Sequence, residues 1–492
     1  MTTFAGRCGV DDAARRQATE QTLALIGSTG IDRVRLAWCD LHGITRGKTL
    51  MPGAAGRALR EGIGLVGTLM LKDTSDRTAF SVFEPGGMAG LPGFEGAANL
   101  ILLPDPSSYR QLPWAHATGW MQGQLWFQDG RPVHLDTRLV LQRALARLHD
   151  AGFRLRCGLE VEFHIYRIRD SAAQMDPELA AWPGLPPAVD LIHPGYNLLT
   201  EAWWDMAEEP LRIVQQTAQS LGLPIVSLEI ELGPSQVEAV FEADDALVAA
   251  DNMVLFRGAV KQALRRAGYH ATFMCRPPFP NIMSSGWHLH QSLVHAASGI
   301  NAFRRDSPAP GAMPRDAQYT LSAIGEHYLA GLLLHARAAA VCCTPTVNGF
   351  ARFQPNALAP QSVLWGRDNR GAALRVVGSC GDEDTRIENR IGEPGANPYL
   401  YLASQIYAGL DGIDRALRTP PATDSPYAAG HERLPTGLEE ALAALENDPV
   451  LCAGLGEAFV GYFARIKRSE LMRYEDAADK TDFQRREYFS RF

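Results

Sequence analysis

The segment GLEVEFHIY, residues 158–166, places two carboxylates on one side of an apolar strand pattern. Side chains alternate across a strand, so Glu160, Glu162 and His164 share one face and the apolar residues between them share the other. An unpaired charge among buried apolar side chains is costly in free energy. We therefore expect something cationic to lie against these glutamates.

Three further segments show strand-like patterns with polar side chains on one face. They are SLEIELGPSQVEAVF (227–241) with Glu229, Glu231 and Glu238, SGWHLHQSL (285–293) with His288 and His290, and TRIENRIGEP (385–394) with Arg386, Glu388 and Arg390. One such pair alone is more typical of a solvated edge strand or a satisfied polar face. Four in one chain indicate a divalent-metal cluster. Its oxygen-rich ligands suit Mg²⁺ or Mn²⁺ better than Zn²⁺.

Arginines accompany the acidic segments. The stretch 352–375 supplies Arg352, Arg367, Arg370 and Arg375, in addition to Arg386 and Arg390. A guanidinium binds carboxylate or phosphate through two parallel hydrogen bonds. Metal ions beside a group of arginines are what phosphoryl transfer requires, because both neutralise the transferred group. Arg367 is expected to be an ordinary surface ion pair.

The elements that position these residues differ along the chain. The first 130 or so residues predict a helix at 11–28, a hairpin within 31–51 and strands at 99–109 and 123–133, which indicates a small β-rich domain. Amphipathic helices then alternate with strands, and they are predicted at 136–153, 208–223, 243–269, 328–343 and 398–417. The sequence thus predicts an α+β protein with domains at 1–130 and 131–492. A surface loop is predicted at 419–437.

Composition excludes several classes of protein. Hydrophobic residues make up 46% of the chain and charged residues 21%, which argues against disorder. The formal net charge of −8 disfavours binding to nucleic acid or to an anionic membrane. No apolar run is long enough to span a bilayer, and no signal peptide is recognised. The eight cysteines are scattered without a CxxC pair, which predicts reduced thiols in the cytoplasm.

The ordered motifs resemble those of the glutamine synthetase superfamily. The motifs are FEGAANLILLPDPSS, GLEVEF, ELGPSQVE, SGWHLHQSL, NGFARFQPNALAP, DNRGAALR and TRIENRIGEPGANPYL. The resemblance implies an N-terminal β-grasp-like domain and a larger catalytic α/β domain with a curved antiparallel sheet. It also implies a homo-oligomer, usually a dodecamer of two hexameric rings with active sites between subunits.

The resemblance also assigns roles by position. It implies that Glu162, Glu231 and Glu238 hold one metal ion, that Glu160, His288 and Glu388 hold a second, and that two or three Mg²⁺ or Mn²⁺ ions are bound in all. Arg352 and Arg390 would bind substrate L-glutamate. The residues implied to contact ATP or the transferred phosphoryl group are Arg370, Arg375, Arg386, His290 and Ser292.

The amine site departs from the pattern of true glutamine synthetases, which have a flap glutamate six residues after the glutamate-binding arginine. Leu358 occupies that position here, and a leucine can neither attract a cation nor accept a proton. Trp287 and Phe350 are predicted as further apolar walls, whereas Asp73 and Tyr196 match the family's ammonium-site aspartate and tyrosine. The chain is therefore most similar to γ-glutamylamide synthetases.

The resemblance implies an ATP-dependent ligase that joins the γ-carboxylate of L-glutamate to a small alkylamine or an aromatic amine through γ-glutamyl phosphate. Such a reaction would open a route of amine catabolism. Two alternatives remain, an ammonia-using glutamine synthetase and a catalytically inactive structural or sensory relative. A further departure is Met283-Ser284-Ser285, where the family usually has Asn-Gly before the Ser-Gly-x-His motif, so specificity for L-glutamate depends on a changed loop.

Overall fold

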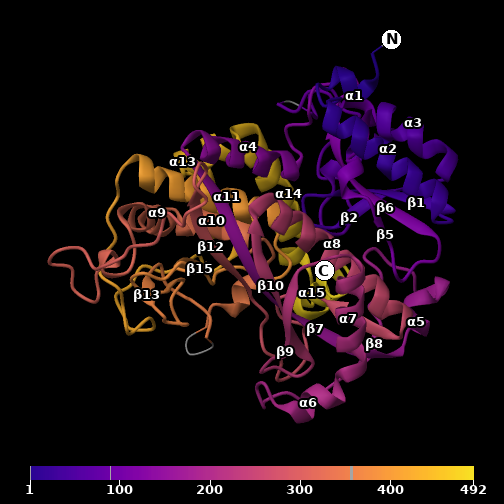
Figure 1. Cartoon of the computed structure of the whole chain (residues 1–492). Coiled ribbons are helices and arrows are strands. Elements are labelled where there is room, and N and C mark those ends of the chain that lie inside the picture. Colours follow the sequence, from indigo (N-terminus) through magenta and orange to yellow (C-terminus); the bar gives the residue numbers. More distant parts are fainter. Residues whose placement is uncertain (1, 89, 355–357) are drawn as a thin grey trace.

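A computed structural model describes residues 2–88, 90–354 and 358–492. The described residues form two sheets with helices packed on and between them (Figure 1). The strands of the first sheet all lie within residues 33–126, and those of the second within 153–389. The boundary predicted near residue 130 lies between the last strand of the first sheet and the helix that follows, and it stays a prediction.

The N-terminal sheet has the strand order β2-β1-β6-β4-β3, and β5 pairs with β6. Its strands are β1 (Arg33–Cys39), β2 (Thr45–Leu50), β3 (Ile63–Val66), β4 (Asn99–Pro104), β5 (Arg110–Gln111) and β6 (Thr118–Trp126). The predicted hairpin is confirmed, with Cys39 opposite Thr45. The short α1 (Phe4–Arg7) precedes α2 (Ala13–Ser28), which confirms the predicted first helix.

Neither the short α1 nor the longer helix that follows β2 was predicted from the sequence. The segment PGAAGRALRE forms α3 (Pro52–Glu61), and its two glycines obscure the helical signal in the sequence. Proline is well suited to the first helical position, and Ala55, Ala58 and Leu59 are buried beneath the helix. Tertiary packing therefore supplies the stability that intrinsic propensity lacks.

The second sheet is a curved, largely antiparallel sheet in the order β13-β14-β15-β12-β7-β10-β9, which confirms the predicted fold class. Only the pairing of β13 with β14 is parallel among its described strands. Its strands are β7 (Phe153–Asp170), β8 (Ala188–Leu191), β9 (Ile225–Ile230), β10 (Gln236–Asp245), β11 (Tyr269–Thr272), β12 (Trp287–His295), β13 (Trp365–Arg367), β14 (Leu374–Val377) and β15 (Arg386–Asn389). The long β7 contacts β8, β10, β11 and β12 and is the central support of this sheet.

Helices cover the apolar face of the large sheet. They include α4 (Thr137–Asp150), α7 (Glu208–Ser220), α8 (Ala246–Arg266) and α11 (Pro398–Asp414), which confirm four predicted helices. Leu159, Val161 and Phe163 on β7 are buried against this layer. The short α5 (Ala172–Met175) and α6 (Glu201–Met206) lie outside the core. The C-terminal region contains four more helices, α12 (Leu438–Glu446), α13 (Pro449–Leu455), α14 (Glu457–Asp476) and α15 (Lys480–Tyr488). The predicted loop at 419–437 is confirmed.

Buried polar contacts join the two sheets near the end of β15. The Asn397 side chain donates hydrogen bonds to the carbonyl oxygens of Asp40 and Leu41 in the β1–β2 turn. The buried Arg257 guanidinium donates to the carbonyl oxygens of Pro394 and Ala396, and also to that of Gly43. The segment that follows β15 is therefore fixed against the N-terminal hairpin.

No single helix among the described residues is long and apolar enough to cross a membrane. Helices α13 and α14 pass such a test only as a pair, and they meet at an angle of 98°.

The predicted helix at 328–343 is interrupted at His335. Its two parts are α9 (Ala323–Leu334) and α10 (Ala336–Cys343). The buried His335 ring lies between two carboxylates, with Nδ1 2.6 Å from Asp448 Oδ2 and Nε2 3.0 Å from Asp411 Oδ2. Burial opposes the charged imidazolium, but the hydrogen bonds and charges of Asp448 and Asp411 outweigh it and raise the pKa of His335. The two contacts of His335 thus hold α11 and the start of α13 against the junction of α9 and α10.

We predict that His335→Leu lowers the free energy of unfolding by about 3 kcal/mol near pH 6, because the Asp448 carboxylate then loses its cation and Asp411 keeps only its ion pair with Arg415. The charged imidazole contributes fully below the unfolded histidine pKa of about 6.5 and loses its contribution as pH rises through the raised folded pKa. Chemical denaturation should therefore show a smaller difference from wild type at high pH. His116→Leu, at an exposed site, is the control. An equal loss at both pH values would contradict this assignment.

Candidate active site

The polar face of the large sheet aligns the predicted ligands in adjacent rows. In the strand register, Glu238 on β10 lies opposite both Glu162 on β7 and Glu229 on β9. In the next row Glu160 on β7 lies opposite His288 on β12. Residues directly opposed in a sheet point to the same face. The register alone therefore gathers carboxylates and imidazoles from strands that are distant in sequence.

The same rows continue to the strands that carry arginines. Glu388 on β15 lies opposite His290 on β12 and opposite Arg375 on β14. The polar face thus changes from acidic at β9 and β10 to mixed at β14 and β15. Such an arrangement suits a substrate that carries several negative charges together with the cations that accompany it.

Three groups of side chains offer ligand atoms within 4.8 Å of one another. The groups are Glu162, Glu231 and Glu238; Glu160, Glu238 and His288; and Glu160, His290 and Glu388. The first coincides with one predicted trio. The second predicted trio is divided between the other two groups, although His288 Nδ1 still lies 3.4 Å from Glu160 Oε2 and 3.7 Å from Glu388 Oε1. All six predicted ligands are brought together, and His290 joins them.

Among the residues that the structure describes, no side-chain cation forms an ion pair with the first group. Burial, reinforced by the charge of Glu162, raises the pKa of Glu231 to about 8 and that of Glu238 to about 10. Two carboxyl groups thus retain protons at neutral pH unless a cation joins them. Carboxylate oxygens with one imidazole are the ligands that Mg²⁺ and Mn²⁺ accept, so the donor set fits a cluster of such ions.

Glu160 has a different environment. Burial would raise its pKa, but hydrogen bonds from His288 and His290 outweigh burial and hold the pKa of Glu160 well below its usual range. His290 Nε2 lies 3.0 Å from Glu160 Oε1. This carboxylate therefore stays ionised and available at the junction of two of the three groups.

Glu388 is fully buried and lies between Arg390, which was predicted to bind glutamate, and Arg375, which was predicted to contact ATP. Its carboxylate pairs with Arg390 Nη1, and Arg375 Nη1 lies 2.9 Å from its other oxygen. Arg375 also contacts the carboxylate of Asp368, which the sequence did not single out. The neighbouring Arg370 is exposed. The arginines thus partly neutralise a ligand carboxylate as well as facing the site.

Arg352 lacks a carboxylate partner among the residues the structure describes. It lies in the turn η6 (Gly349–Arg352) and is 5% exposed, yet its Nη1 donates only to the carbonyl oxygens of Arg390 and Ile391. Its Nη2 lies 3.4 Å from His288 Nε2. A buried guanidinium without an anionic partner is costly, so this position is well suited to receive the carboxylate of a ligand.

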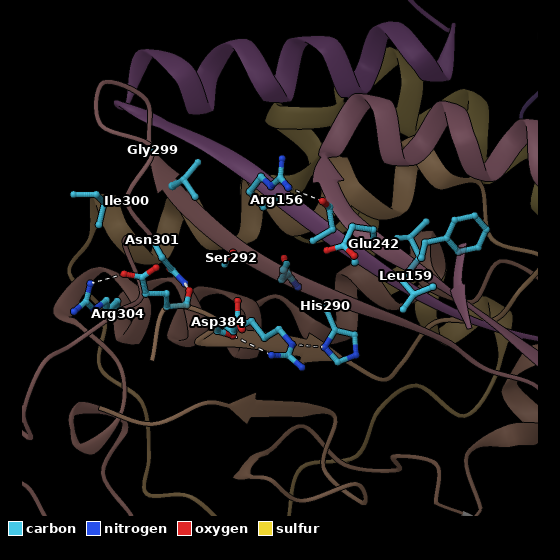
Figure 2. A pocket seen from close by; sticks show the side chains of 18 of the residues that line it. Arg156, Leu159, Glu242, His290, Ser292, Gly299, Ile300, Asn301, Arg304 and Asp384 are labelled. Carbon is cyan, nitrogen blue, oxygen red and sulfur yellow. Dashed lines mark hydrogen bonds and ion pairs between the residues drawn. The ribbon is translucent and has the colours of Figure 1, made fainter. Parts of the chain in front are cut away.

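A cavity of about 730 Å³ opens from the Glu160 end of this face. Figure 2 shows His290 and Ser292 on its floor and the loop residues Ile300 and Asn301 on one side. Arg386 also lines it, and its Nε lies 3.0 Å from His290 Nδ1. Three of the five residues expected to contact ATP therefore line one cavity. Its volume lies within the range of small-molecule sites.

Two further loops, one next to Glu231 and one next to Arg390, expose apolar side chains and have unusual backbone geometry. Tyr196 and Leu199 have φ values of 57°, and their amides donate to the carbonyl oxygens of Leu232 and Ile230, on either side of Glu231. Leu358 has a φ of 52°, and its carbonyl oxygen accepts a hydrogen bond from Arg390. Positive φ is uncommon for bulky residues and clusters at functional sites. Residues 355–357, which precede Leu358, lie outside the described residues.

Two predicted amine-site residues are placed elsewhere. Trp287 is completely buried and packs edge-to-face on Tyr401, because it alternates with His288 and so points to the core face of β12. Asp73 is also completely buried, and its carboxylate accepts hydrogen bonds from Arg473 and from the backbone of Ser75 and Arg77. The assignments of Trp287 as a pocket wall and of Asp73 as an amine-attracting carboxylate are therefore corrected. Phe350 is nearly buried against Phe353 and presents little surface to a ligand.

Sequence reasoning missed the loop residues of the cavity and the partners of the ligands. Asn301, Arg304 and Asp384 line the cavity from irregular segments that carry no periodic signal. Gln236 lies two residues before Glu238 and contacts Glu162. The one sequence feature that could have indicated Gln236 is its spacing, because a polar residue two positions before Glu238 in a strand lies on the same face as that glutamate.

Comparison with known proteins identifies relatives of the whole chain. The family model described as glutamine synthetase, catalytic domain, matches residues 134–486. The gamma-glutamylanilide synthase of an Acinetobacter species is 38% identical, over 97% of this chain and 96% of that protein. The gamma-glutamylethanolamide synthetase of Streptomyces coelicolor is 30% identical over 98% of both chains. The solved GmaS/ADP complex, at 28% identity, covers 93% of this chain and 97% of its own with a TM-score of 0.74.

We predict that affinity for Mg²⁺ rises with pH. Protons held by Glu231 and Glu238, whose pKa values are raised to about 8 and about 10, must leave when the ion binds, so affinity increases by about tenfold per pH unit for each proton displaced. Calorimetry in two buffers of different ionisation enthalpy should measure both the affinity and the released protons. Glu238→Gln, which has no proton to release there, should bind more weakly with a shallower pH slope. An affinity independent of pH between about 6.5 and 8.5 would contradict this account.

Proposed function

The chain belongs to the glutamine synthetase family, and we propose that it is an ATP-dependent ligase that joins the γ-carboxylate of L-glutamate to a carbon-bearing amine. The observation that carries this proposal is the combination of three acidic ligand groups on one sheet face with an unpaired buried guanidinium and an adjoining cavity. The two relatives named for γ-glutamylamide synthesis match nearly the full chain and support the class of reaction.

We place ATP in the large cavity, with its phosphates toward Glu160 and Glu388. His290 and Ser292 lie along the nucleotide, and Arg386 and Arg375 hold the phosphate oxygens, with the exposed Arg370 reaching the transferred group. Bound Mg²⁺ or Mn²⁺ ions, two or three per site, supply positive charge to the phosphate oxygens. The protein's part is to hold the phosphates in line and to keep the arginine charges facing them.

Glutamate binds through Arg352 and Arg390, and the Arg352 guanidinium lies against the backbone of Arg390 because it donates to the carbonyl oxygens of Arg390 and Ile391. A γ-carboxylate oxygen attacks the terminal phosphorus of ATP, the bond to ADP breaks, and γ-glutamyl phosphate forms. The amine nitrogen then attacks the carbonyl carbon, the bond to phosphate breaks, and the proton that the nitrogen loses leaves with the departing phosphate. The predicted pair of arginines keeps the acid in position through both steps.

An aromatic amine fits the remaining end of the site better than an alkylamine or ammonia. At neutral pH ammonia and alkylamines are cations, whereas an aromatic amine is a weak base and is uncharged. Leu358 offers no carboxylate for a cation, and Asp73 is bound to Arg473. The exposed side chains of Tyr196, Leu199 and Leu358 would instead contact hydrocarbon. The 38% identity to a gamma-glutamylanilide synthase supports the same choice.

Assembly and location follow the family. We propose a dodecamer of two hexameric rings with active sites between subunits, located in the cytoplasm, where ATP and glutamate are available. All eight cysteines are free thiols, which is consistent with a reducing compartment. The ammonia-using alternative conflicts with Leu358. The inactive alternative conflicts with the retained ligand groups, because buried acidic clusters are costly without a function.

The direct test of this function is to measure phosphate release from ATP with a panel of different amines. Phosphate release from ATP should require both L-glutamate and an amine, and kcat/KM should be highest for aniline, lower for ethylamine and ethanolamine, and lowest for ammonia. Each methylene-sized group by which two amines differ should change the free energy of transition-state binding by about 1–3 kcal/mol. Ammonia as the best substrate would indicate a glutamine synthetase instead. No release with any amine would favour the inactive relative.

The flap position is tested by Leu358→Glu. A carboxylate there should raise kcat/KM for ammonia at least tenfold, because it attracts ammonium and accepts its proton, and should lower kcat/KM for aniline. Leu334→Glu, which adds the same charge at an exposed leucine at the end of α9, is the matched control and should change neither value. An unchanged amine preference in Leu358→Glu would show that this residue does not select the amine.

A further inference from the structure

Gln236 is a buried neutral residue inside an acidic cluster. It begins β10 and is 2% exposed, and it shares a sheet face with Glu238 two residues later. Its register partner is His164 on β7, one row beyond the Glu238–Glu162 pair. The side chain therefore lies at the edge of the group formed by Glu162, Glu231 and Glu238.

The amide of Gln236 is fully used in hydrogen bonds to three separate segments. Its Oε1 accepts from the backbone N–H of Gly233, at 2.9 Å. Its Nε2, which carries two N–H groups, lies within hydrogen-bond distance of three acceptors: Glu162 Oε2 at 3.2 Å, Ser285 Oγ at 3.0 Å and the Ser284 carbonyl oxygen at 3.2 Å. One amide thus joins the β9–β10 turn, the strand β7 and the segment that leads into β12.

The main chain of the same residue fixes a second glutamate of the group. The Gln236 carbonyl oxygen accepts the backbone N–H of Glu231 at 3.0 Å. Glu162 Oε2 receives a further N–H from Gly286 at 2.7 Å. Within the described residues Glu162 Oε1 accepts no hydrogen bond, so one oxygen is held by two donors and the other is left for a ligand.

The chemistry of this position favours an amide over any charged residue. Three carboxylates offer oxygens within 4.8 Å of one another, so another carboxylate would add repulsion. An ammonium would neutralise the group and compete with a metal ion. An amide has a donor for Glu162 and an acceptor for the Gly233 amide, and it adds no net charge.

We propose that Gln236 is a positioning residue for the metal ion held by Glu162, Glu231 and Glu238. It orients the Glu162 carboxylate and fixes the backbone of Glu231. This inference rests on the proposed function, because that function requires an ion at this group. Partners that orient metal ligands commonly contribute 10- to 100-fold to metal affinity. The ATP-side group of Glu160, His290 and Glu388 contains no partner of Gln236, so its ion should be unaffected.

The test compares Gln236→Met with Gln122→Met in the full chain. Gln122 is a matched control, since its buried amide donates to the carboxylate of Asp251 at 3.0 Å, and it lies on β6 away from the site. Mn²⁺ titrations followed by electron paramagnetic resonance should resolve bound ions in the wild type and in Gln122→Met. In Gln236→Met one class of ion should weaken at least tenfold, while another keeps its affinity.

Kinetics provide a second readout that a loss of stability alone would not produce. In Gln236→Met the KM for ATP should stay within about twofold of wild type, whereas kcat should fall and recover at raised Mn²⁺ concentration. Unchanged Mn²⁺ affinity in Gln236→Met would overturn the positioning role while the proposed function stands. Equal weakening of all ions would overturn it as well. Failure of the wild type itself to bind Mn²⁺ would instead refute the proposed function.

Discussion

Repulsion among buried carboxylates is the constraint on which the site depends. The strands β10, β7 and β12 are held in one register by backbone hydrogen bonds, and this register forces Glu160, Glu162 and Glu238 close together. The strand pairing fixes the backbone positions of these glutamates, so the backbone cannot move apart to relieve the repulsion. Protons or external cations must supply the missing positive charge, which makes this face a receptor for metal ions.

The protein distributes its own positive charge unevenly around this cluster. At one end Arg375 and Arg390 contact Glu388, and the two histidines contact Glu160. At the other end Glu231 and Glu238 have no arginine, lysine or histidine within ion-pair distance among the described residues. Phosphate and carboxylate groups are therefore attracted to the first end, and metal ions to the second. The direction that we propose for the substrates across the sheet follows from this gradient of charge.

The alternation of side chains in strands made much of the site predictable. The same rule, applied consistently, would have excluded Trp287, since it neighbours His288 and must point to the opposite face. Asp73 was beyond such reasoning, because its partner Arg473 is 400 residues away and nothing in either segment indicates the pairing. The break at His335 was hidden for the same reason: its two carboxylate partners come from α11 and α13. Local patterns thus predicted the elements, whereas ion pairs between distant segments decided which side chains were free.

The hydrogen bonds between the β1–β2 turn and residues 394–397 have a consequence for exchanging parts between relatives. Arg390 stands four residues before Pro394, whose carbonyl oxygen is held by Arg257 together with that of Gly43. The N-terminal hairpin thus supports the segment that carries Arg390, the arginine that we propose binds glutamate. A chimera with the hairpin of another relative would preserve the catalytic sequence completely and still displace that arginine, unless the backbone oxygens of the new turn came to the same places.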